Sequence, residues 1–150
     1  MRTYEEDGYL ITEYDSGTRV KALIQRAEFG TSLARIRAEK IKELNETCEK
    51  LIVDGITYNG KKYDFDRDTQ LNMLGWQSKI IFCQLNEMPV TTIPWYAQGE
   101  SCEDMSVNDF IALCGVGEQH KSALITECKR LKEQVNLMST IEDIRGVMLE

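Results

Sequence analysis

An Asn-Gly dipeptide at residues 59–60 is the feature that most constrains the fold of this chain. It lies between two short runs of β-branched and aromatic residues, GITY and KKYDF. A two-residue hairpin turn requires positive φ at both central positions, which Asn and Gly tolerate better than other residues. The segment therefore predicts a tight β-hairpin, and a helix is expected to follow from about Asp68 to Leu85. The predicted apolar face of that helix comprises Leu71, Leu74, Lys79 or Ile80, Ile81 and Leu85.

Three aspartates at alternate positions, Asp64, Asp66 and Asp68, follow this turn. Such a run could form a calcium loop, an acidic catalytic cluster or the end of a strand. A calcium loop that starts at Asp64 would need Gly at its sixth position and a carboxylate at its twelfth. Those positions hold Thr69 and Gly75. We therefore expect no metal here, and we predict that Asp68 caps the N-terminus of the following helix.

Turn signals and apolar periodicity divide the rest of the chain into further elements. EFGTS is read as a break before the first helix, with Thr31 or Ser32 as its cap, and the VTTIPWYA strand is an edge strand because Pro94 lacks an N–H donor. Two capping patterns, Ser106 with Asp109 and Thr140 with Asp143, mark helix starts. The predicted elements are a β-hairpin over 8–24, a long helix over 32–52, the edge strand, a long helix from Ser106 to Asn136, and a short final helix.

The helix predicted over 32–52 carries a heptad-like apolar seam that includes Ile41, Leu44 and Cys48. Arg37 interrupts this seam. Two interpretations follow: the helix packs on its own domain, or it packs against copies of itself around a symmetry axis.

Charge and cysteine content exclude several classes of protein. The net charge of −7 argues against nucleic acid as a main partner, and the segment from Ile80 to His120 contains no Lys or Arg. This acidity serves solubility or matches a basic partner surface. The five cysteines include no Cys-x-x-Cys pair, so zinc is not expected, and the thiols are predicted to be reduced. Cys102, in a polar loop, is the candidate for an intersubunit disulfide.

Membrane insertion and catalysis also find no support in the sequence. No apolar run approaches the ~18–20 residues of a membrane span, and the N-terminus shows no secretory signal. His120 is the single histidine, so a nucleophilic triad would have to use it. It falls off the predicted apolar seam, where we expect it to be solvated. We therefore predict no enzymatic activity and no cofactor.

The order and the local amino-acid sequence of these motifs resemble those of a family of domains of unknown function found in tailed bacteriophages. The resemblance covers about residues 33–148. It rests on Tyr58-Asn59-Gly60, Asp66 and Asp68, Gln70 to Met73, Trp95, Leu131-Lys132 and Thr140-Ile141. Members of this family commonly form the C-terminal part of tail-fibre or tail-associated structural proteins. The resemblance implies a virion component or an assembly accessory, and it carries no catalytic residues over to this chain.

Together these features predict a helix-rich α+β protein, with a hairpin arm over residues 1–30 and a helical domain over 31–150. The expected function is that of a structural or adaptor protein of a phage tail, neck or fibre-attachment region. It would reside in the virion after assembly in the host cytoplasm, as a trimer or ring bound to other tail or fibre proteins. The alternative is a tail-fibre assembly chaperone absent from the particle. The candidate interface residues are Tyr4, Tyr9, Ile11, Tyr14, Ile41, Leu44 and Cys48.

Overall fold

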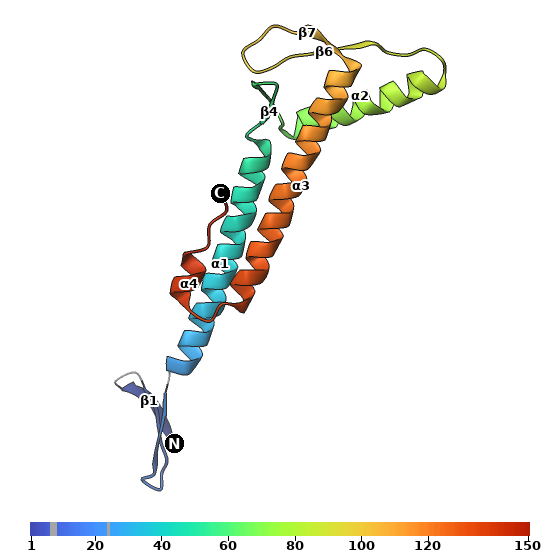
Figure 1. Cartoon of the computed structure of the whole chain (residues 1–150). Helices are drawn as coiled ribbons and strands as arrows, with labels where there is room; N and C mark the ends of the chain where they lie inside the picture. The colour runs from blue at the N-terminus through green and yellow to red at the C-terminus, as the bar shows by residue number, and fades with distance from the viewer. Residues whose placement is uncertain (7–8, 24) are drawn as a thin grey trace. The chain divides into compact units, whose positions relative to one another are not determined.

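The computed structural model describes residues 1–6, 9–23 and 25–150, with side chains for 1–4, 11–21 and 32–150 (Figure 1). The described helices are α1 (Gln25–Val53), α2 (Arg67–Leu85), α3 (Val107–Leu137) and α4 (Ile141–Arg145). The described strands are β1 (Arg2–Glu6), β2 (Tyr9–Glu13), β3 (Arg19–Leu23), β4 (Ile56–Tyr58), β5 (Lys61–Tyr63), β6 (Thr92–Trp95) and β7 (Glu103–Ser106). This composition confirms the predicted helix-rich α+β class.

Contacts within the chain divide it into two compact units. The first comprises residues 1–42 and 133–147, and the second comprises residues 43–132 and 148–150. Helices α1 and α3 each contribute to both units. The boundary expected at residue 30 lies inside α1.

An antiparallel sheet in the order β1-β2-β3 forms the N-terminal part of the first unit. The predicted hairpin corresponds to β2 and β3, which pair from Tyr9 opposite Leu23 to Glu13 opposite Arg19. Gly17 closes their turn at a φ of 79°, a conformation that glycine adopts without steric cost. Strand β1 was not predicted, because its short charged sequence lacks the apolar alternation of a half-buried strand.

Helix α1 begins at Gln25, seven residues before the predicted start at residue 32. The EFGTS segment therefore lies inside the helix, and the prediction that this segment separates the hairpin from the helix was wrong. A glycine within a helix costs only about 1 kcal/mol relative to alanine. That cost is small against the cooperative propagation of a 29-residue helix.

Two basic side chains of α1 bind backbone carbonyls near the C-terminus of the chain, within the first unit. Arg37 Nη2 donates to the carbonyl of Met138, directly after α3. Lys40 Nζ lies 3.4 Å from the carbonyl oxygen of Arg145 and 3.3 Å from that of Val147. Carbonyls at helix ends lack intrahelical partners, and basic side chains satisfy them well. The interruption of the α1 seam at Arg37 thus has a structural purpose.

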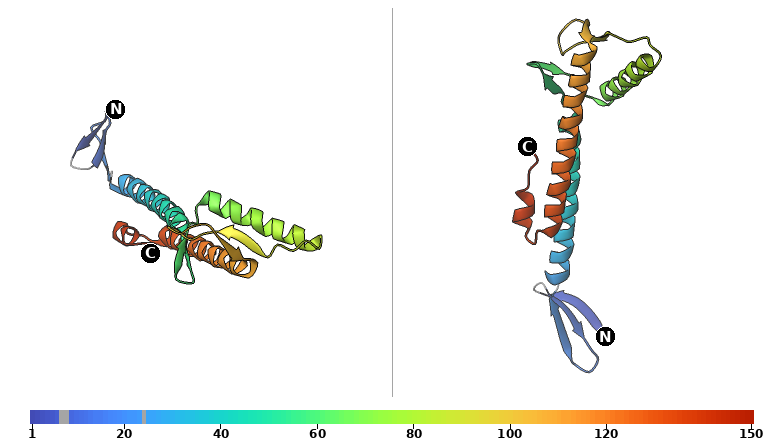
Figure 2. Two further views of the ribbon diagram at one scale, coloured as in Figure 1. Left: turned by 90° about the horizontal axis from the view of Figure 1, so that it is seen from above. Right: turned by 45° about the vertical axis from the view of Figure 1, so that its right-hand side comes forward.

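Helices α1 and α3 lie side by side in the second unit (Figures 1 and 2). Leu44 and Cys128 are 2% and 3% exposed, and Cys128 Sγ lies 3.6 Å from the Leu44 carbonyl oxygen. Phe110 and Leu113, near the start of α3, are completely buried. None of the helices among the described residues combines the length and apolarity that crossing a membrane requires.

The hairpin predicted from the Asn-Gly dipeptide is confirmed. Strands β4 and β5 pair with Tyr58 opposite Lys61, and Asn59 and Gly60 have φ values of 48° and 75°. The edge strand around Pro94 is also confirmed as β6, which pairs antiparallel with β7. Strand β7 was not predicted, because its sequence EDMS reads as loop followed by a helix cap.

Both capping patterns are confirmed. The Asp109 N–H donates to Ser106 Oγ at 3.1 Å, and the Asp143 N–H donates to Thr140 Oγ1 at 3.2 Å. Each hydroxyl satisfies one backbone donor that has no partner inside its helix. The Ser106 hydroxyl donates in turn to Asp109 Oδ2 at 2.7 Å, which holds the pKa of that carboxyl below its usual range.

Candidate interaction surface

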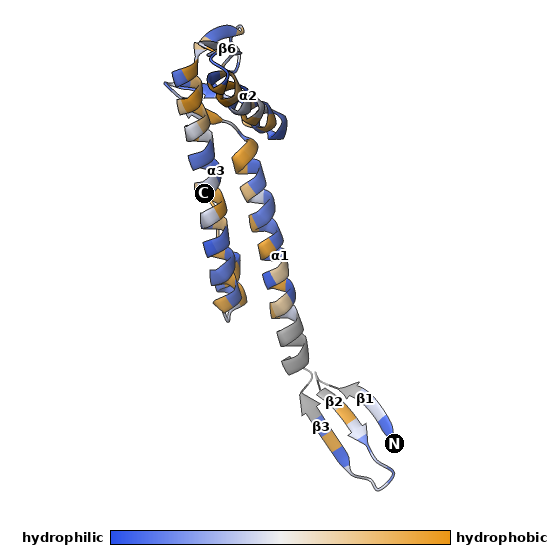
Figure 3. Ribbon diagram, turned by 90° about the vertical axis from the view of Figure 1, so that its right-hand side faces the viewer, coloured by the Kyte–Doolittle hydropathy of each residue, from blue (hydrophilic) through white to orange (hydrophobic). Residues whose placement is uncertain are grey.

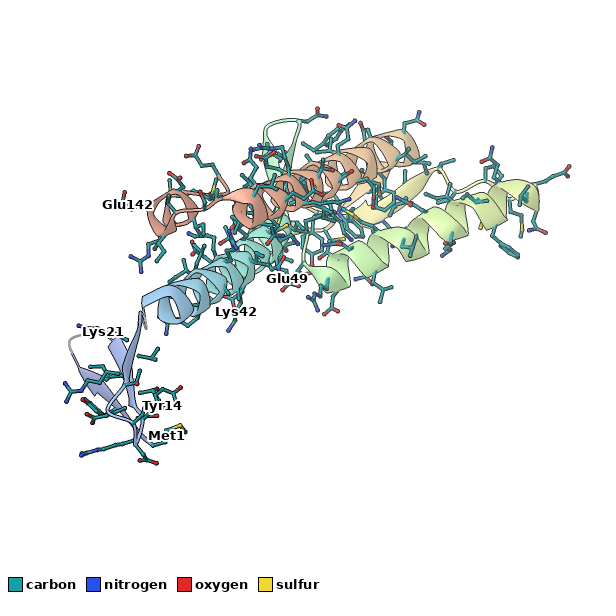
Figure 4. The ribbon with its side chains drawn as sticks, turned by 90° about the horizontal axis from the view of Figure 1, so that it is seen from below. Met1, Tyr14, Lys21, Lys42, Glu49 and Glu142 are labelled. Carbon is teal, nitrogen blue, oxygen red and sulfur yellow. The ribbon has the colours of Figure 1, made fainter. Side chains whose placement is uncertain are left out.

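Helix α2 exposes a row of large apolar side chains, which we call the α2 stripe. Side chains project from this helix on the side turned away from α3 (Figure 4). Apolar residues recur along its length (Figure 3). The stripe consists of Leu71, Leu74, Ile81, Phe82 and Leu85, which are 58–79% exposed. Exposing such a row to water does not stabilise a monomer.

The face of α2 that packs on the rest of its unit is a different one from the predicted face. Met73 and Ile80 are buried, at 4% and 9% exposure. Of the predicted apolar residues, only Ile80 is buried, whereas Leu71, Leu74, Ile81 and Leu85 face solvent. The prediction of the buried face was therefore wrong. Because α2 carries apolar residues around most of its circumference, periodicity alone could not select the face that packs.

The N-terminus of α2 is anchored firmly to its unit. Phe65, just before the helix, is 2% exposed and makes an edge contact with His120, with ring centroids 6.1 Å apart. Gln70 Nε2 donates to the Phe65 carbonyl at 2.8 Å, and Lys121 of α3 donates to Gln70 Oε1 at 2.9 Å. These bonds fix the rotation of α2 about its axis, and so they fix the direction in which the stripe points.

The C-terminus of α2 is closed by two backbone bonds of the Schellman type. The Met88 N–H donates to the Cys83 carbonyl at 2.9 Å, and the Glu87 N–H donates to the Gln84 carbonyl at 3.3 Å. Glu87 has a φ of 57°, the left-handed conformation that this motif requires. Asn86 Nδ2 also donates to the Phe82 carbonyl at 2.7 Å. The helix therefore ends at a defined place, directly after the stripe.

A groove of about 780 Å³ adjoins the N-terminal half of the stripe. Its apolar lining includes Ile52, Val53, Phe65, Leu71, Leu74 and Cys114. Its charged lining residues are three acids, Glu46, Glu49 and Glu118, and three bases, Lys50, Arg67 and Lys121. Arg67 Nη2 lies 3.2 Å from Glu49 Oε1, and Glu49 is labelled in Figure 4. An apolar lining with balanced charges suits a protein side chain better than a charged small molecule.

Cys114 and His120 lie near the groove, and both pack against other parts of their unit. Burial raises the pKa of the Cys114 thiol, which favours the protonated and weakly nucleophilic form. His120 Nε2 lies 3.0 Å from the Leu51 carbonyl oxygen, so the ring packs between helices. The prediction of a solvated histidine was therefore wrong. The Leu51 carbonyl and the edge contact with Phe65 hold the His120 ring in place.

The three alternate aspartates serve three different local purposes. Asp64 Oδ1 accepts a hydrogen bond from Gln98 Nε2 at 2.6 Å. Asp66 is the N-cap of α2, with Oδ1 accepting from the Thr69 N–H at 2.7 Å. Asp68 lies in the first turn of α2, so the prediction that it caps the helix was wrong: the cap lies two residues earlier, at Asp66. Within the described residues, no group of three or more His, Cys, Asp or Glu side chains is arranged to hold a metal ion.

Replacing Asp66 with alanine is expected to lower thermal stability at neutral pH. Hydrogen bonds from the backbone N–H and the side-chain hydroxyl of Thr69 lower the pKa of the Asp66 carboxyl. The stabilisation is therefore complete above the unfolded pKa of about 3.9 and is lost as the pH falls through the lower, folded pKa. Melting temperatures of the two proteins should converge on acidification. Asp68→Ala, which removes the same charge two residues later, should show a smaller effect; equal effects would contradict the capping role.

The predicted interface residues of α1 are buried or half-buried within the chain. Leu44 and Cys48 are 2% and 7% exposed, and Ile41 is half-buried. Burial is also the main cause that raises the pKa of the Cys48 thiol. These residues pack within their own chain, which favours the interpretation that the helix packs on its own domain.

The predicted interface residues of the N-terminal arm differ in how far their side chains are exposed to solvent. Tyr14 is 43% exposed, Tyr4 is half-buried, and Ile11 is 5% exposed. Arg2 stacks over the Tyr4 ring, with 5.6 Å between its Cζ and the ring centroid. The side chain of Tyr9 lies outside the described residues. Of the three described side chains, that of Tyr14 is the most exposed.

Cys102, the candidate for an intersubunit disulfide, is exposed and forms no disulfide with the described residues of its own chain. It lies in the segment that connects β6 and β7. Its exposure leaves the thiol accessible to another chain, and its pairing stays a prediction.

Comparison with known proteins places the chain in a family. The model of a domain of unknown function, DUF4376, matches residues 35–146. The chain belongs to this family. The matched range agrees with the range of about 33–148 over which the sequence resembles a family of unknown function, and the family description names no activity. No curated protein and no solved structure matched the chain.

Proposed function

We propose that this DUF4376 protein is a structural or adaptor component of a tailed bacteriophage virion that acts through protein–protein assembly. The observation that carries the proposal is the α2 stripe, a row of large apolar residues held rigidly in solvent by fixed helix ends. Exposed apolar rows of this kind mark protein interaction sites. The attribution to a phage tail, neck or fibre-attachment region rests on the motif resemblance to phage tail-associated proteins.

The distribution of polar groups supports an assembly role over a chemical one. Asp66, Ser106 and Thr140 cap helices, while Arg37 and Lys40 bind carbonyls near helix ends. These side chains stabilise the fold and leave the apolar groove to receive another protein. The proposed partners are other tail or fibre proteins and further copies of this chain.

Quantitative mass spectrometry of purified particles and of infected-cell lysate tests this proposal. A virion component should be present at several copies per particle and should survive high-salt washing and density-gradient purification. Presence in the lysate with absence from the particle would favour a tail-fibre assembly chaperone. The adaptor proposal would then be abandoned.

A further inference from the structure

The stripe lies on one side of α2 together with a small residue at its centre. With 100° of rotation per residue, the five stripe residues fall within an arc of about 100°, and Ser78 falls inside the same arc. Ser78 lies midway between Leu71 and Leu85, and also midway between Leu74 and Phe82. The stripe is therefore nearly symmetric about Ser78 along the helix.

We propose that the α2 stripe pairs with the α2 stripe of a second copy of this chain, antiparallel, about a two-fold axis close to Ser78. A two-fold contact uses the same surface on both partners, so it requires a surface that is complementary to itself. Pairing about Ser78 places Leu71 against the partner's Leu85. It also places Leu74 against the partner's Phe82. Each half of the stripe therefore contacts the opposite half of the partner's stripe.

The centre of the stripe permits close approach of two helices. The Ser78 hydroxyl donates to the Leu74 carbonyl at 3.0 Å, so this polar group already has a partner within its own helix. A methyl group built on Gly75, beside Ser78, would meet no atom within 4 Å. Small residues at a crossing point allow helices to pack at about 8–10 Å between axes.

The groove beside the stripe offers a place for the partner's aromatic side chain. Leu71 and Leu74 belong to both the stripe and the groove lining. In the antiparallel pair, the partner's Phe82 lies opposite Leu74, and so it reaches the groove. Phe82 is 64% exposed in the single chain, and aromatic residues that enter partner pockets dominate interface energetics.

The charges at the two ends of the stripe match the antiparallel arrangement. Arg67 lies one turn before Leu71, and Glu87 lies two residues after Leu85. Pairing about Ser78 therefore brings Arg67 near the partner's Glu87. The ion pair of Arg67 with Glu49 has side-chain exposures of 81% and 71%, and solvated pairs of this kind exchange at little cost.

The exposed area is sufficient for a stable two-fold contact. Including Met88, three residues after the end of the helix, six large apolar side chains are 58–79% exposed. With an area on the order of 200 Å² for each side chain, they present roughly 800 Å² per protomer, which is what a standard interface buries on each side. A second copy is therefore an adequate occupant. The inference stands on α2 alone and does not require incorporation into a virion.

Light scattering coupled to size-exclusion chromatography of the full chain is the first test. We expect a mass of about twice the 17.2 kDa of one chain. Phe82→Asp should reduce the mass to that of one chain while far-UV circular dichroism stays unchanged. The matched control, Ile125→Asp, alters an apolar residue of α3 with 49% exposure and should remain dimeric. A monomeric native chain, or a dimer that Phe82→Asp leaves intact, would overturn the inference.

A charge exchange tests the antiparallel register. Arg67→Glu should weaken the dimer at low salt, because it places two carboxylates together at each end. Combining Arg67→Glu with Glu87→Arg should restore the dissociation constant to within a few-fold of the native value. A double variant no tighter than the single one would overturn the proposed register.

Cross-linking tests the position of the two-fold axis, in a Cys102→Ser background that removes the exposed native thiol. Ser78→Cys should give a disulfide-linked dimer on mild oxidation, because the residue meets its own copy at the axis. Asn72→Cys, exposed on a different face of α2, should remain uncross-linked. Equal cross-linking of the two variants would overturn the axis. Since these measurements use purified protein, their failure is distinguishable from absence of the chain in particles.

Discussion

Replacing Phe110 with alanine is expected to lower the free energy of unfolding by about 3–5 kcal/mol. Phe110 is completely buried near the start of α3. Its ring packs edge-on against Trp95 of β6, with centroids 5.2 Å apart and planes at 69°. Truncation loses both the apolar transfer energy and the aromatic contact, and it leaves a cavity that the surrounding helix and hairpin cannot close.

Urea denaturation followed by circular dichroism at a fixed protein concentration measures this loss. The concentration must be fixed because self-association would add to the apparent stability. Ile111→Ala is the matched control, since this neighbouring residue is 51% exposed. Its effect should stay within about 0.5 kcal/mol, as is usual for surface positions. If the two variants unfolded at similar urea concentrations, Phe110 would not be the centre of this core.

Replacing Gly117 with alanine is expected to destabilise the protein by about 1–3 kcal/mol, although alanine is the better helix former. A methyl group at this position would lie 2.8 Å from Cζ of Phe65, and closer still to Cε2. The Phe65 ring is 2% exposed and anchors the start of α2. A contact this short requires the Phe65 ring or the helix to shift.

Gly115 provides a control on the same helix, two residues away. A methyl group there would meet nothing within 4 Å. Gly115→Ala should therefore stabilise the protein by up to about 1 kcal/mol through helix propensity alone. Opposite signs for the two substitutions in the same thermal-unfolding assay would support the close contact. Combining Gly117→Ala with Phe65→Leu should cost less than the sum of the two single changes, because both act on one contact.

The elements that could be predicted from sequence are those with a local physical signal. The positive φ at Asn59 and Gly60, and the side-chain caps at Ser106 and Thr140, are decided by residues within a few positions of one another. The start of α1 could not be placed, because a single glycine was read as a stop although the helix continues through it. Strands β1 and β7 were missed because strand pairing depends on partners distant from the local sequence.

The candidate surface was harder to predict than the fold. The sequence identified the apolar residues of α2 but assigned most of them to the buried side. Only the anchoring of Phe65 beneath α3, together with the bonds of Gln70, fixes which side of the helix turns outward. Similarly, the sequence shows Arg37 only as an interruption of the apolar seam, whereas the structure shows its long-range hydrogen bond to the Met138 carbonyl. Both facts depend on contacts across more than 50 residues, or on the rotation of a helix in three dimensions.

The placement of the two tryptophans has a practical consequence for spectroscopy. Trp95 contacts the Phe110 ring, whereas Trp76 lies on α2 with the Lys79 ammonium 4.6 Å from its ring centroid. In a Trp76→Phe protein, Trp95 is the remaining tryptophan, and its fluorescence emission would follow unfolding around the buried Phe110 ring. Trp76 lies five residues after Leu71, on the side of α2 opposite the stripe. Fluorescence emission from a Trp95→Phe protein would therefore follow the packing of that side of α2, so the two chromophores report on unfolding from two separate places in the fold.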